Sequence, residues 1–184
     1  MFAPTPRGLA LAALALGIVL AAGCASLTPR PTFTGESVSV IRISSPDIVQ
    51  VKVDAPDGVT MLPEEQDRLG HTIKSKVDAR KAANAADVVG STYEVNVRVS
   101  RYEKGNAFAR AMLAGLGQMH IEGQVAVFRM PEHRPAGEFE LKKTFAWGGA
   151  YGAGTSIEDI ENSFADGVAA AVTGQLHEPP KQKK

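Results

Sequence analysis

The most regular stretch of this 184-residue sequence is residues 91–102, which read Ser-Thr-Tyr-Glu-Val-Asn-Val-Arg-Val-Ser-Arg-Tyr. Apolar and polar residues alternate strictly through it, with Tyr93, Val95, Val97 and Val99 on one side and Glu94, Asn96, Arg98 and Ser100 on the other. Successive side chains of a strand point to opposite faces of a sheet, so the pattern predicts a strand with one buried face and one solvated face. We therefore expect a sheet that is covered on one side.

Two later segments show the same alternation, residues 120–130 and residues 138–147. Their apolar positions are Ile121, Val125 and Val127 in the first and Phe139, Leu141, Phe145 and Trp147 in the second. Residues 131–137 contain proline and glycine, so we expect an antiparallel hairpin with a turn there. Residues 37–44 and 48–53 are rich in β-branched residues and are also predicted as strands.

Two helices are expected. The first opens at Pro63, carries an apolar stripe of Leu69, Ile73 and Val77, and ends near Asn84. The second opens with a capping box of Thr155 and Glu158. Its apolar stripe consists of Ile157, Ile160, Phe164, Val168, Val172 and Leu176.

The order of these elements predicts an α/β (α+β) two-layer sandwich. We expect a mixed sheet of four to five strands, with a crossover through the first helix and the helices packed mainly on one face. Residues 37–177 then form a single domain, and the polar tail 178–184 is expected to be disordered.

Composition narrows the classes of function. The chain has 20 basic and 20 acidic residues and no net charge, which argues against a nucleic-acid partner bound through phosphate neutralisation. A single cysteine excludes an intramolecular disulfide, so the domain must rely on its hydrophobic core.

That cysteine, Cys24, follows an N-terminal segment typical of a signal peptide, residues 1–23. Arg7 supplies a positive charge, and the uncharged run 9–20 is too short for a mature transmembrane helix. The sequence Leu20-Ala21-Ala22-Gly23-Cys24 resembles the lipobox of bacterial lipoproteins, although the usual leucine position holds Ala21.

The lipobox resemblance implies cleavage between Gly23 and Cys24, a diacylglyceryl thioether on Cys24, and acylation of the new amine with a fatty acid such as palmitate. Ala25, where an aspartate would indicate inner-membrane retention, favours the outer membrane, with the domain facing the periplasm. Residues 24–36 then form the lipidated N-terminus and linker. Two alternatives stay open: a plain secretory signal cut near Ala25, and an uncleaved anchor helix.

The run from Tyr93 to Arg110 resembles the domain-of-unknown-function 4410 family of bacterial lipoproteins, through its strand and its Gly-Asn-x-x-x-Arg segment at 105–110. The Gly115-Leu116-Gly117 stretch and the strand 121–128 continue the resemblance, which we extend over residues 36–176. The resemblance implies a lipoprotein and leaves its activity open.

The segment 107–117 is a candidate interaction site. Phe108, Met112, Leu113 and Leu116 have helical spacing, and Arg110 lies among them. If exposed, they would form a patch for a partner or the membrane. The alternative to an exposed patch, which we favour, is that these apolar residues pack on the sheet and that Arg110 binds a backbone carbonyl or an acid.

Other candidate sites are weak. A glycine-rich loop before the last helix is a candidate anion site, with Gly148, Gly149, Gly152 and Gly154. It lacks the Gly-Lys-Ser/Thr ending of a P-loop and the Gly-x-Gly-x-x-Gly spacing of a dinucleotide-binding loop, so we favour a plain connector. Four scattered histidines predict no metal site, and no nucleophile motif is present. We expect no cofactor other than the covalent lipid and no catalytic residue.

The sequence leaves two functions open. The first is a non-enzymatic, membrane-anchored envelope lipoprotein that binds another envelope protein as an assembly accessory. The second is a periplasmic small-molecule or lipid-binding module with an apolar pocket between helix and sheet. The sequence does not indicate an oligomeric state.

Overall fold

The computed structural model of the chain describes residues 32–33, 41–81, 89–113, 116–146 and 153–175. The signal segment, Cys24 and the tail from residue 178 therefore lie outside the described residues. The prediction of a linker over residues 24–36 is wrong at Thr32–Phe33, which form a strand that pairs with residues 139–140. In the part that is described, no helix combines the length and the apolar character needed to cross a membrane.

A five-stranded sheet organises the fold, with strands in the order β1-β5-β4-β3-β2. Their bounds are Thr32–Phe33 for β1, Ile48–Asp54 for β2, Thr92–Glu103 for β3, Met119–Met130 for β4 and Arg134–Phe145 for β5. Only β2 and β3 pair in parallel, and every other pairing is antiparallel. The prediction of a mixed sheet with a late hairpin is thus confirmed.

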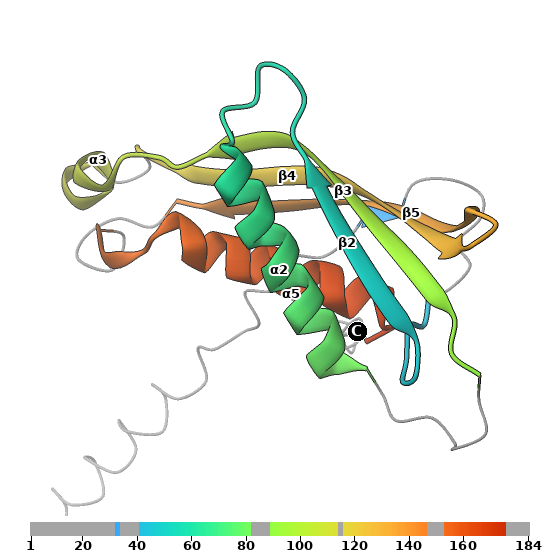
Figure 1. The fold of residues 1–184 in the computed structure, drawn as a ribbon. Coiled ribbons are helices and arrows are strands. Elements are labelled where there is room, and N and C mark those ends of the chain that lie inside the picture. Colours follow the sequence, from blue (N-terminus) through green and yellow to red (C-terminus); the bar gives the residue numbers. More distant parts are fainter. Residues whose placement is uncertain (1–31, 34–40, 82–88, 114–115, 147–152, 176–184) are drawn as a thin grey trace, which may run out of the picture.

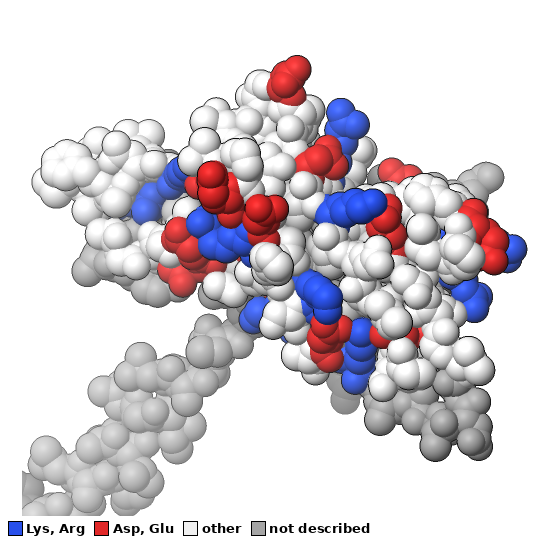
Figure 2. All heavy atoms as spheres, in the orientation of Figure 1, with Lys and Arg blue, Asp and Glu red and all other residues white. Residues whose placement is uncertain are grey.

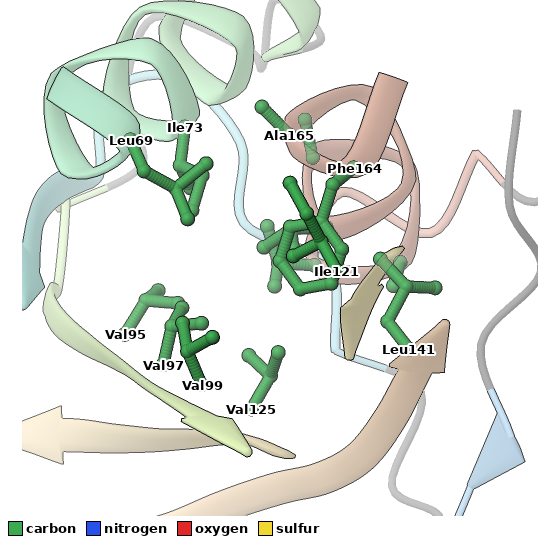
Figure 3. Close-up of a cluster of buried hydrophobic side chains, with 14 of the residues drawn as sticks. Leu69, Ile73, Val95, Val97, Val99, Ile121, Val125, Leu141, Phe164 and Ala165 are labelled. Atoms are coloured by element: carbon green, nitrogen blue, oxygen red, sulfur yellow. The ribbon is translucent and has the colours of Figure 1, made fainter. Parts of the chain in front are cut away.

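Two long helices, α2 (Pro63–Arg80) and α5 (Ile157–Val172), lie side by side over one face of the sheet (Figure 1). Their apolar stripes meet the inward residues of β3, β4 and β5 (Figure 3). Leu69 and Ile73 of α2 and Phe164 of α5 are fully buried, as are Val95 and Val97. The expected two-layer sandwich is confirmed, and the opposite face of the sheet carries mostly polar side chains.

The helix α5 begins one residue later than its predicted capping box. Ser156, not Thr155, is the N-cap, and its backbone N–H donates to the Asp159 carboxylate over 2.8 Å. The predicted partner Glu158 faces Arg68 of α2 instead, at 3.8 Å.

The strand predicted for residues 37–44 is wrong over its described part, since residues 41–44 form no strand. Ile41 and Ile43 are nonetheless buried, and the Ile43 backbone N–H donates to the carbonyl of Val172 over 2.9 Å. The β-branched residues in this segment therefore cover the C-terminal end of α5 rather than extend the sheet.

The remaining differences concern element ends. The strand β5 begins at Arg134, because the turn is tighter than predicted and His133 adopts a left-handed φ of 53°. The first helix ends at Arg80, and Asn84 lies outside the described residues.

The packing of the core can be tested by substituting one buried and one exposed phenylalanine. Phe164→Ala should lower the free energy of unfolding by about 3–5 kcal/mol, because it leaves a cavity where the ring is fully buried. Phe108→Ala, whose ring is 75% exposed, should change it by less than about 0.5 kcal/mol. Urea denaturation of both variants measures the difference, and equal losses would contradict the described packing.

Candidate functional site

A patch of large apolar side chains is exposed around the short helix α3 (Ala107–Met112). We call it the α3 tip and define it by Phe108, Met112, Leu113 and Leu116, which are 54–75% exposed. The helix projects beyond the end of the sheet, away from α2 and next to the start of α5 (Figure 1). The expectation that this stripe packs on the sheet is therefore wrong.

The neck of this projection explains why the tip stays away from the core. Gly105 and Gly117 flank it with left-handed φ values of 64° and 70°. The Asn106 backbone N–H donates to the Gly117 carbonyl over 3.2 Å, and the Asn106 side chain caps α3 by accepting from the Ala109 N–H over 3.0 Å. A loop closed on itself in this way cannot fold its apolar residues back onto the sheet.

Arg110 fixes the direction of the projection. Its guanidinium is almost fully buried and donates to the Gly117 carbonyl over 2.9 Å and to the Thr155 carbonyl over 3.1 Å. Thr155 directly precedes the N-cap of α5, so Arg110 ties the α3 segment to the second layer. The prediction that Arg110 holds backbone carbonyls is confirmed.

Behind the tip lies a cluster of charged and polar residues that joins three elements, which we call the Glu161 cluster: Arg68, Tyr102, Glu158 and Glu161. Arg68 donates to both carboxylate oxygens of Glu161 over 2.8 Å, and the Tyr102 hydroxyl donates to the same carboxylate over 2.7 Å. Glu161 is 2% exposed, so these hydrogen bonds offset the cost of burying its charge. Sequence reasoning missed this cluster, because its members lie far apart in the chain.

The chemistry of the Glu161 cluster is structural. Burial and the hydrogen bond to Glu161 raise the pKa of Tyr102 far above its usual value, so the phenol stays protonated as a donor. The hydrogen bonds that Arg68 donates to Glu161 raise the pKa of Arg68 above its usual value. Both oxygens of Glu161 accept hydrogen bonds from Arg68 or Tyr102, so this carboxylate joins α2, β3 and α5.

A second candidate site is an open hollow of about 690 Å³ between α2 and the edge strand β2. It is lined largely by polar side chains: Lys52, Asp54, Gln66, Asp67, His71, Lys74, Glu94 and Asn96, with Val51, Val53 and Gly70. The most buried of them, Glu94, pairs with Lys52 over 2.6 Å and accepts from the Asn96 amide over 3.0 Å. The hollow differs from the expected apolar pocket between helix and sheet, where core side chains fill the space (Figure 3).

The other predicted positions do not assemble into a site. Gly154 is exposed, and a methyl group added to it would meet no atom within 4 Å, while Gly148, Gly149 and Gly152 lie outside the described residues, as does Cys24. His120 contacts Thr144 and Gln118, and His133 stacks on Phe128. Across the described residues, no three metal-ligating side chains are grouped.

The neck of the α3 segment can be tested with two glycines. Gly105→Ala should lower the free energy of unfolding by more than about 2 kcal/mol, because φ is 64° and a methyl group there would collide with the Gly117 carbonyl. Gly154→Ala meets open space and should change it by less than about 0.5 kcal/mol. Thermal denaturation, with hydrogen exchange at residues 106–113, measures both; equal effects would contradict a closed neck.

The hollow predicts a dependence of stability on pH. Hydrogen bonds from Lys52 and Asn96 hold the pKa of Glu94 below its usual value of 4.5. The resulting stabilisation is complete above the pKa of the unfolded chain and is lost as pH falls through the lower pKa of the folded chain. Glu94→Gln should therefore cost about 1–2 kcal/mol at pH 7, and the difference from the wild type should shrink below pH 4.5.

Denaturant titrations at pH 7 and at pH 3 to 4 would measure this shrinkage. The matched control is Glu138→Gln on the same open face of the sheet, where the side chain is exposed and a change within about 0.5 kcal/mol at either pH is expected. A loss for Glu94→Gln that stays constant with pH would contradict the assigned ion pair.

Three comparisons place the chain among known proteins. Its fold is similar to the PelC dodecamer from Paraburkholderia phytofirmans, with 12% identity, a TM-score of 0.49, and 79% of this chain and 96% of that chain covered. It is also similar to a DUF330 protein from Xanthomonas campestris, with 14% identity, a TM-score of 0.45, and 79% and 95% covered. At these low values the similarities say nothing about activity or assembly.

No curated protein matches the chain. The family described as Domain of unknown function (DUF4410) matches residues 52–149, which is just over half of the sequence. The match includes the features on which the resemblance was based, namely residues 93–110, the Gly115-Leu116-Gly117 stretch and the strand 121–128, and it is shorter than the expected range 36–176. The chain therefore belongs to the DUF4410 family.

Proposed function

We propose that this chain is a membrane-anchored lipoprotein of the bacterial cell envelope, attached to the outer membrane by a diacylglyceryl group on Cys24 and facing the periplasm. The support is the sequence of residues 1–24, in which a charged start, a short apolar run and small residues precede the only cysteine. Three acyl chains, palmitate among them, hold a protein far more firmly than one.

The folded domain acts by binding rather than by catalysis, as an accessory that contacts another envelope protein. The α3 tip is the observation that supports binding rather than catalysis, because four large apolar side chains are exposed on a neck that keeps them in place. Exposed apolar surface of this kind marks a contact with a protein or a membrane. In the Glu161 cluster behind the tip, Arg68 and Tyr102 both donate hydrogen bonds to Glu161.

The alternative, a small-molecule or lipid-binding module, has less support. Its pocket was expected between helix and sheet, where Ile73, Val97 and Phe164 are fully buried in the core. The hollow beside β2 is open, and its lining is charged, which suits neither a lipid nor another apolar ligand.

The anchor is tested by metabolic labelling. The full chain and its Cys24→Ser variant are expressed in a bacterium with two membranes, fed a palmitate analogue and fractionated. The wild type should carry the label and sediment with the outer membrane, and Cys24→Ser should lose the label completely. A third variant, Phe108→Ser, should keep the label, because its change lies far from the processing site in the sequence.

An unlabelled wild type whose mature form begins near residue 25 would overturn the proposed anchor. The domain would then be a free periplasmic protein, and the ligand-binding alternative would become the better one.

A further inference from the structure

The direction of the strand β1 relates the proposed anchor to the α3 tip. β1 pairs antiparallel with β5, with Thr32 opposite Glu140 and Phe33 opposite Phe139. β5 ends at Phe145, which pairs with Met119 at the end of the sheet that carries α3. Because β1 runs the opposite way, Thr32, its N-terminal residue, is the one nearer to that same end.

The length between the cysteine and the sheet limits where the membrane can lie. Cys24 precedes Thr32 by eight residues, which span at most about 29 Å when fully extended. The five residues from Glu140 to Phe145 occupy about 17 Å of strand. Cys24 therefore reaches at most about 12 Å beyond the α3 end of the sheet.

A reversal toward the other end of the sheet is disfavoured by the sequence. Pro29 and Pro31 precede β1, and a proline biases the residue before it, here Thr28 and Arg30, toward extended conformations. Proline-rich linkers are also semi-rigid spacers. The shortness of the segment between Cys24 and Thr32 thus favours an orientation in which the end of the domain that carries α3 faces the bilayer.

The chemistry of the α3 tip suits that location. Figure 2 shows the projecting end of the molecule as a surface almost without charge, next to the red and blue residues around its base. The one charged residue of the segment 107–117, Arg110, turns inward to two backbone carbonyls. An aromatic ring and long apolar side chains exposed on a rigid projection are what the interface of a bilayer accepts.

From these observations we propose that the α3 tip inserts into the phospholipid surface to which Cys24 is attached, as a second contact that fixes the orientation of the domain. This inference rests on the proposed function and names the partner of the same surface. It makes the membrane, rather than a protein, the occupant of the α3 tip.

The test uses the full chain, purified in lipidated form and reconstituted into phosphatidylethanolamine–phosphatidylglycerol vesicles. With Cys24 acylated, Phe108→Cys provides a single free thiol for an environment-sensitive fluorophore. Val89→Cys is the matched control, because Val89 is 91% exposed and lies three residues before the opposite end of β3. Lipid-borne nitroxides should quench the fluorophore at position 108 at least threefold more strongly than the one at position 89.

A further variant separates insertion from simple proximity. Adding Met112→Asp and Leu113→Asp to Phe108→Cys should bring quenching down to the level at position 89, because charges in the tip oppose insertion. Both side chains are exposed, so the fold should tolerate the changes.

The outcomes are distinguishable. Equal quenching at positions 108 and 89 in protein whose mass includes the acyl chains overturns the inference and leaves the proposed anchor intact. Protein without acyl mass overturns both. Protection of position 108 in intact cells but not in pure lipid vesicles assigns the α3 tip to a protein partner and overturns the lipid assignment.

Discussion

A β-bulge in β3 is the constraint on which the rest of the structure depends. Val95, Val97 and Val99 face the helices, and strict alternation would next bring Arg101 to that side. The register with β4 shifts between Val99 and Arg101, so Arg101 turns to the open face, where it binds Glu103, and Tyr102 turns inward. One extra residue therefore decides that the phenol of Tyr102, and not the guanidinium of Arg101, joins Arg68 at the buried carboxylate of Glu161.

The β-bulge also affects how the α3 tip is supported. Tyr102 and Arg68 share Glu161, so β3, α2 and α5 are joined where β3 leaves the core. One residue beyond Tyr102, β3 ends at Glu103, which pairs with His120 of β4, and the α3 segment lies at this end of the two strands (Figure 1). Arg110 then closes the arrangement by binding the carbonyl of Thr155 at the start of α5. The projection is thus supported from both layers, and its exposed apolar residues keep a defined direction.

Elements with a repeated pattern could be predicted from the sequence, because burial on one face repeats the same signal several times. The alternation in β3 and the stripes of α2 and α5 are of this kind. The expected strand was wrong over residues 41–44, because β-branched residues favour any buried extended chain, and the buried Ile43 donates its backbone N–H to Val172 of α5 rather than to a strand. The α3 segment failed for the opposite reason: its spacing is amphipathic, but two left-handed glycines and Arg110, whose effects are tertiary, hold it away from the core.

The proposed orientation also separates the surface that contacts the membrane from the open face of the sheet. In the orientation that we propose, the α3 end of the strands points toward the bilayer, so the open face of the sheet stands away from the lipid surface. That face is polar and internally paired, as where Lys142 lies 2.8 Å from both Glu122 and Glu140. Exposed ion pairs of this kind contribute little stability and are readily exchanged for intermolecular ones. A protein partner on this face would therefore not compete with the membrane, and one domain could use its apolar end for the bilayer and its polar face for another envelope protein.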